Sequence, residues 1–176
     1  MRLPALLFVV NNMERPLLNI YKISSWVDWG EQMRGTYAII MELGSDEIIS
    51  VGKLGKINFK KGYYLYVGSG QNSLGTRVAR HLRKRKKKFW HIDYLLSQRG
   101  TRIKEVWIAE DRRIECLTAR KILKEVNTPL VAKKFGSRDC DCPTHLFYLN
   151  QSAKLARDLL KGLNFHPYSI NSWTTS

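Results

Sequence analysis

The order of strand-like and helix-like segments constrains the fold of this chain more than any other feature. Three segments rich in β-branched and aromatic residues come first, at residues 36–43 (TYAIIMEL), 47–51 (EIISV) and 63–67 (YYLYV). Such residues are typical of strands. Residues 44–46 (GSD) form a turn signal between the first two segments, which predicts that these two strands pair as a hairpin.

Helical patterns gather later in the chain. A loop rich in Gly, Ser and Asn at residues 68–73 leads into a basic helix, with Asn72 or Ser73 able to cap it. Further helices are predicted at 90–96, 114–125 and 153–163, and further strands at 103–109 and 145–149. Strands that come first and helices that come later favour an α+β fold over a doubly wound sheet. We expect a small mixed or antiparallel sheet of about three to five strands flanked by helices.

Length and composition set the class of protein. The 176 residues are 44% hydrophobic, which is enough for one buried core. No apolar run approaches the length of a transmembrane helix, and three cysteines are too few for a disulfide scaffold, which favours the reducing cytoplasm. We expect an N-terminal extension at 1–33, one domain at 34–150, and a C-terminal helix and tail at 151–176.

Positive charge is concentrated in one segment. The chain has 30 Lys and Arg against 15 Asp and Glu, and eight of the cations lie between Arg77 and Lys88 without an acid. The apolar row Leu74, Val78 and Leu82 is too narrow for a membrane-surface helix, so no membrane partner is expected. The segment is either a solvated face or a patch that contacts phosphates, and we favour DNA, or RNA, as the partner. The residues predicted to bind nucleic acid are Arg80, Arg83, Lys84, Arg85, Lys86, Lys87, Lys88 and His91.

Several short motifs follow one another in a recognisable order. Gly35-Thr36-Tyr37 opens one strand, Tyr66-Val67-Gly68 closes another, and Arg77 and His81 share a face of the basic helix. They stand in the segments GTYAIIMEL, YYLYVGSG, RVARHL, FWHIDYLL, IECLTAR and FGSRDCDCPTHLFYL. From Arg34 to Asn150 this order resembles the GIY-YIG nuclease superfamily, and most of all a small uncharacterised prokaryotic branch of it.

The resemblance implies a GIY-YIG-like fold and a metal-dependent endonuclease that hydrolyses DNA, with structure-specific cleavage in repair or recombination as one form of it. It implies that Glu115 holds one Mg²⁺ or Mn²⁺, that Arg77 grips the scissile phosphate, and that Tyr37 acts as general base or orients the attacking water. The catalytic residues expected from it are Tyr37, Tyr66, Arg77, His81 and Glu115.

Each of these residues also has a structural interpretation. Tyr37 and Tyr66 suit a packed sheet, His91 suits a half-buried position, and an acid at Glu115 suits a helix N-terminus. Thr36 replaces the isoleucine usual in the superfamily, and we expect this replacement to have no effect on function. The alternative to an enzyme is therefore a non-catalytic DNA- or RNA-binding module with the same fold.

The segment Cys140-Asp141-Cys142-Pro143-Thr144-His145 offers three ligands to zinc, with Cys116 a distant fourth. Cys-x-Cys is tighter than the usual zinc spacing and no second pair exists, which argues against zinc at Cys140, Cys142 and His145. We expect instead a polar turn that caps the sheet. In that case Ser137, Arg138, Asp139 and His145 would line the substrate groove.

Overall fold

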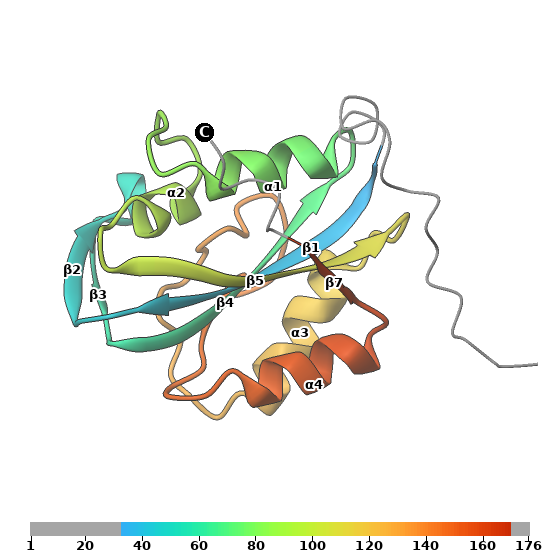
Figure 1. Cartoon of the computed structure of the whole chain (residues 1–176). Coiled ribbons are helices and arrows are strands. Elements are labelled where there is room, and N and C mark those ends of the chain that lie inside the picture. Colours follow the sequence, from blue (N-terminus) through green and yellow to red (C-terminus); the bar gives the residue numbers. More distant parts are fainter. Residues whose placement is uncertain (1–32, 170–176) are drawn as a thin grey trace, which may run out of the picture.

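A computed structural model describes residues 33–169 and shows an α+β fold (Figure 1). A five-stranded antiparallel sheet has the strand order β6-β4-β1-β5-β7, and β2 and β3 form a separate two-stranded sheet. The predicted fold class is confirmed. The strands are β1 (Gly35–Leu43), β2 (Glu47–Ser50), β3 (Lys56–Phe59), β4 (Gly62–Gly70), β5 (Thr101–Glu110), β6 (Leu146–Tyr148) and β7 (His166–Tyr168). The helices are η2 (Gly52–Leu54), α1 (Leu74–Leu82), α2 (His91–Leu96), α3 (Glu115–Glu125) and α4 (Lys154–Gly162).

The large sheet is covered on both faces, with α1 and α2 on one side and α3 and α4 on the other (Figure 1). Side chains alternate between the two faces of a strand, so β1 contributes to two cores. Ile39 and Met41 belong to the core under α1 and α2, whereas Ala38 and Ile40 belong to the core under α3 and α4. Burial on both faces explains why β1 reads as a continuous apolar run.

The predicted hairpin between residues 36–43 and 47–51 is wrong. Strand β1 pairs with β4 and β5, while β2 pairs with β3, where Ile49 faces Ile57. The sequence around β3 (KINF) is basic and rich in glycine, which hides its alternation of exposed and buried residues. Ile57 and Phe59 nevertheless join the core under α1 and α2, and this burial stabilises the small sheet against the domain.

Strand β4 is longer than predicted and includes residues 68–70, which we expected to form a loop. Gly68 lies opposite Tyr37 of β1. A Cβ atom at Gly68 would lie 2.5 Å from the hydroxyl oxygen of Tyr37, a distance that real Cβ atoms do not adopt. Glycine at this position therefore leaves the space that the phenol of Tyr37 occupies.

The domain extends beyond residue 150, where we expected it to end. Helix α4 packs Ala156 and Leu160 into the second core, and β7 pairs with β5, so that Val106 faces Tyr168. Without α4 this face of the sheet would expose its apolar residues, which explains why the helix belongs to the fold. The predicted extension at 1–33 lies, except for Met33, outside the described residues. Among the described helices, none has the length and apolar character needed to cross a bilayer.

Candidate functional site

Three of the predicted catalytic residues form one buried cluster. Tyr37 comes from β1, Tyr66 from β4 and His81 from α1, and their exposed fractions are 2%, 6% and 2%. The hydroxyl oxygen of Tyr37 lies 2.7 Å from Nε2 of His81. The ring centroids of Tyr66 and His81 are 6.2 Å apart.

The surroundings fix the protonation states of this cluster. Burial is the main cause that lowers the pKa of His81 to about 3, and the charges of Lys86, Arg80 and Arg77 contribute to the same shift. His81 is therefore neutral near pH 7, and Nδ1, which lies 4.0 Å from Oδ1 of Asp93, is the nitrogen placed to carry the proton. Burial also raises the pKa of Tyr37 well above its ordinary value, and the neighbouring Tyr66 adds to this. Tyr37 is therefore a neutral phenol that donates a hydrogen bond to Nε2 of His81.

Arg77 and Glu115, the other two predicted catalytic residues, act electrostatically on both tyrosines. Burial is the main cause of the raised pKa values of Tyr37 and Tyr66, but Glu115 raises them as well, and Arg77 lowers them. The guanidinium carbon of Arg77 lies 5.1 Å from the centroid of the Trp90 ring, a cation–π contact that restrains it. The side chain of Glu115 is 25% exposed and is therefore accessible to a ligand.

Thr36 positions the start of α3 and so positions Glu115. Its hydroxyl donates to the carbonyl oxygen of Arg112 at 2.7 Å and accepts from the backbone N–H of Ile114 at 3.0 Å. Both partners lie just before Glu115, so Thr36 links the central strand to the first turn of α3. The sequence interpretation missed this role, although a hydroxyl in an otherwise apolar strand was a signal for it.

Several of the cations predicted to bind nucleic acid are held within the protein. Helix α1 ends at Leu82, and Lys86 returns to donate hydrogen bonds to the carbonyl oxygens of Arg80 and His81 at the helix C-terminus. Arg80 forms an ion pair with the buried Asp93 at 2.7 Å. The ammonium group of Lys84 donates to the carbonyl oxygens of Leu96, Gln98 and Thr101.

The other cations of the segment face solvent. Within residues 33–169, the side chains of Arg83, Arg85 and Lys87 make no hydrogen bond or ion pair, and Lys88 lies 5.2 Å from the centroid of the Tyr94 ring. These residues, with Phe89, form what we call the basic loop, residues 83–89. Phe89 is 76% exposed, a feature that the sequence analysis did not single out. A cavity of about 510 Å³ lies between α1 and the basic loop and is lined by Arg80, Arg83, Arg85, Lys86 and Lys87.

His91 has a structural partner. Its Nδ1 accepts a hydrogen bond from the backbone N–H of Gly136 at 3.2 Å, and its ring packs against Phe135. Burial lowers the pKa of His91, as does the charge of Arg138. His91 therefore anchors the long connection between α3 and β6, which agrees with the half-buried interpretation considered from the sequence.

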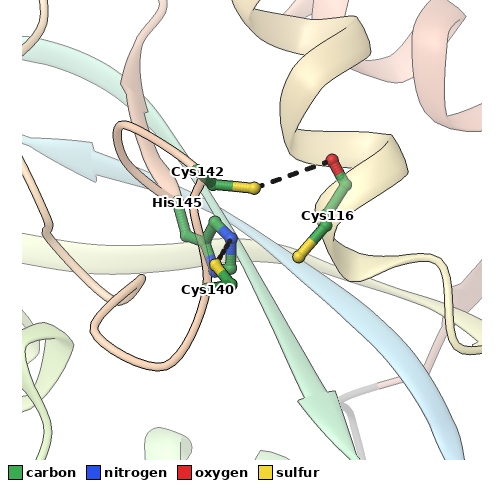
Figure 2. Close-up of side chains that lie close together, drawn as sticks. All are labelled: Cys116, Cys140, Cys142 and His145. Carbon is green, nitrogen blue, oxygen red and sulfur yellow. Dashed lines mark hydrogen bonds between the residues drawn. The ribbon is translucent and has the colours of Figure 1, made fainter.

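That connection, residues 126–145, contains no helix or strand and brings the cysteines together. Cys140, Cys142 and His145 lie next to Cys116 of α3, and one ligand atom from each falls within 4.8 Å of the others (Figure 2). The four residues are called the Cys/His cluster below. The sequence argued against zinc from the short Cys-x-Cys spacing, but α3 supplies a fourth ligand from the first turn after Ile114. Of the expected groove residues, Ser137 and His145 are buried, whereas Arg138 and Asp139 are exposed.

Comparison with known proteins identifies one family. A profile described as "Domain of unknown function DUF123" matches residues 36–165, from the second residue of β1 through α4, and so includes the candidate catalytic residues and the Cys/His cluster. No curated protein and no solved structure matches the chain.

Proposed function

We propose that this chain, which belongs to the DUF123 family of domains of unknown function, is a metal-dependent endonuclease that acts on DNA. The observation that carries the proposal is the buried Tyr37–His81 hydrogen bond, on which the charges of Arg77 and Glu115 both act. The resemblance of the motifs around these residues to the GIY-YIG nucleases gives the same assignment. The cation-lined cavity beside α1 supports a polyanionic substrate.

Hydrolysis of a phosphodiester requires a water molecule to lose a proton as it attacks phosphorus. Tyr37 is not a phenolate in this structure, so it serves best as a relay. Its oxygen would accept a proton from water while its own proton passes to Nε2 of His81, which is 2.7 Å away and neutral. Asp93, which lies 4.0 Å from Nδ1 of His81, would stabilise the imidazolium that results.

The remaining residues would handle negative charge. Arg77 would bind the scissile phosphate through its planar guanidinium, with Trp90 holding the side chain in place. Glu115 would hold the divalent cation, because a single carboxylate suffices where Mg²⁺ keeps several waters and binds substrate phosphates. When bound, the cation would stabilise the leaving alkoxide and the charge on phosphorus. Arg83, Arg85 and Lys87 would follow the DNA backbone without reading its sequence.

A nicking assay on supercoiled plasmid with Mg²⁺ or Mn²⁺ tests the proposal. We expect the wild type to nick, and Glu115→Gln and Arg77→Ala each to lower the rate at least about 100-fold. The matched controls are Glu125→Gln, at the far end of the same helix, and Arg99→Ala, an exposed arginine outside the site. Both controls should nick like the wild type.

Two results would contradict the proposal in different ways. If Glu115→Gln nicks at the wild-type rate, the metal site is misassigned. If the wild type binds DNA at low salt but never nicks, the chain is the non-catalytic binding module that was the alternative from the sequence. RNA duplexes and single strands in the same assay define the class of substrate.

A further inference from the structure

The Cys/His cluster has the composition of a complete metal site. Three thiols and one imidazole are the ligand set of many structural zinc sites, and zinc binds them as a tetrahedron. All three cysteines of the chain are in the cluster, and none forms a disulfide. Cys142 and His145 are buried, and Cys116 and Cys140 are partly buried, so the site is closed to solvent on most sides.

The separations suit a single ion. Ligand atoms about 2.3 Å from a tetrahedral ion stand about 3.8 Å apart. The four ligand atoms already lie within 4.8 Å of one another, so the widest separation would contract by about 1 Å. Nε2 of His145 is the nitrogen that faces the thiols, because it lies 3.5 Å from Sγ of Cys140 (Figure 2).

The segment that carries the cysteines has no regular secondary structure, although Phe135 is buried in the core and Gly136 donates a hydrogen bond to His91. Residues 126–145 contain no helix or strand, and structureless connections of this length are uncommon in compact domains. Two backbone hydrogen bonds fold the segment on itself, from Lys134 to Pro143 at 2.6 Å and from His145 to Phe135 at 2.8 Å. Toward the first turn of α3 the segment makes only short-range polar contacts, such as the thiol of Cys142 with the carbonyl oxygen of Cys116 at 3.9 Å, and a metal ion would join the two directly.

We propose that Cys116, Cys140, Cys142 and His145 bind one structural Zn²⁺. Three thiolate sulfurs and Nε2 of His145 occupy its four positions, and the thiol protons are released to solvent when the ion binds. No open position remains for water, so the ion is structural and has no catalytic role of its own.

The zinc site also bears on Glu115, and this part of the inference rests on the proposed function. A zinc ion on Nε2 leaves the proton of His145 on Nδ1, which lies 3.1 Å from Oε1 of Glu115. A carboxylate that faces the second nitrogen of a metal-bound histidine fixes the ring and is itself fixed by it. Glu115 is thereby positioned with one oxygen toward His145 and the other available to the catalytic cation.

Metal analysis of the full-length protein, purified without chelator, tests the site. We expect one zinc ion per chain in the wild type. Cobalt added to the metal-free protein should give the absorption bands of tetrahedral Co²⁺ bound to thiolate. Cys116→Ser and Cys140→Ser should lose most of the zinc, whereas His166→Asn, which changes an exposed histidine outside the cluster, should retain it.

Two results overturn the site: a wild type without zinc that gives no thiolate–cobalt bands, or full retention of zinc by both cysteine variants. The cobalt spectrum needs only the wild type, so it decides the matter even if a variant fails to fold.

Glu115→Gln separates the zinc site from the proposed nuclease activity. It should still bind one zinc ion, but with an affinity about 10-fold weaker in competition with a chelator, while Glu125→Gln binds like the wild type. Unchanged affinity in Glu115→Gln overturns the coupling to Glu115. All these measurements are made without nucleic acid, so failure of the nuclease proposal does not affect them.

Discussion

Individual residues of the candidate site were visible in the sequence, but their environments were not. The motif order picked out Tyr37 and His81, and the structure brings them within hydrogen-bonding distance. The sequence did not show that Asp93 faces the far nitrogen of His81, since Asp93 reads as an ordinary acid of a short helix. Nor did it show that the imidazole is neutral, because that state follows from burial between elements that are distant in the chain.

The buried neutral imidazole of His81 predicts a specific pH dependence of stability. Its pKa of about 3 in the folded protein lies below the ordinary value of 6.5 for the unfolded chain. The unfolded chain therefore takes up a proton below pH 6.5 and the folded protein does not. Stability from this residue is complete above pH 6.5 and falls as the pH drops, by about 2 kcal/mol between pH 7 and pH 5.

Urea unfolding at several pH values checks this. In His81→Asn the free energy of unfolding should fall less steeply between pH 7 and pH 5 than in the wild type, even though the variant is less stable at both. His166→Asn, at an exposed position, should keep the wild-type slope. Equal slopes for the wild type and His81→Asn would show that His81 is not held neutral.

At the level of elements, the cationic run shows that charge composition alone does not predict which cations face solvent. Eight cations in twelve residues predicted one basic helix facing phosphates. In the structure the helix ends at Leu82, and Arg80, Lys84 and Lys86 bind groups of the protein itself. Charge repulsion among consecutive cations disfavours a longer helix. Most of the groups that bind Arg80, Lys84 and Lys86 belong to other segments of the chain, so the composition of the cationic run does not reveal them.

For the proposed DNA substrate, this division of the cations predicts how the binding affinity would depend on salt concentration. Replacing Arg83, Arg85 and Lys87 together with alanine should weaken binding to duplex DNA. The replacement should also reduce the slope of log affinity against log salt concentration by about 3, because each phosphate contact contributes about 0.9. Thermal stability should not change, since these side chains make no hydrogen bond or ion pair within residues 33–169.

Fluorescence anisotropy over a series of salt concentrations measures the effect. The comparison variant is Lys86→Met, which should lower the thermal stability of the protein through the loss of its contacts at the C-terminus of α1. An unchanged salt slope in the triple variant would place the DNA on another face of the molecule.

At the scale of the whole molecule, the fold class was predictable and the topology was not. The segments expected as strands and helices were mostly found, because apolar periodicity reflects burial. The hairpin was expected because strands adjacent in the sequence usually pair. The expectation was wrong because β1 pairs with β4 and β5, which come later in the chain. Strand β7 (HPY) has no apolar alternation, so its place at the edge of the sheet left no signal in the sequence.

The inclusion of α4 in the domain is testable. Leu160→Ala should lower the free energy of unfolding by about 2–4 kcal/mol, because Leu160 is fully buried in the core under α3 and α4. Leu155→Ala on the same helix should change it by no more than about 0.5 kcal/mol, since Leu155 is 41% exposed. Denaturant titrations of the two variants provide the measurement. Equally small changes in the free energy of unfolding for both variants would show that α4 does not belong to the folded core.

The central position of β1 also determines at which stage of protein synthesis the candidate site can assemble. Tyr37 leaves the ribosome early, but the strand that carries it is flanked by β4 and β5, and β5 ends only at Glu110. Glu115 follows β5, and His145, beside Glu115, is made later still. A nascent chain therefore has no complete candidate site until most of the domain has been translated. Under the proposed function, cleavage of nucleic acid would have to wait for this late stage of synthesis.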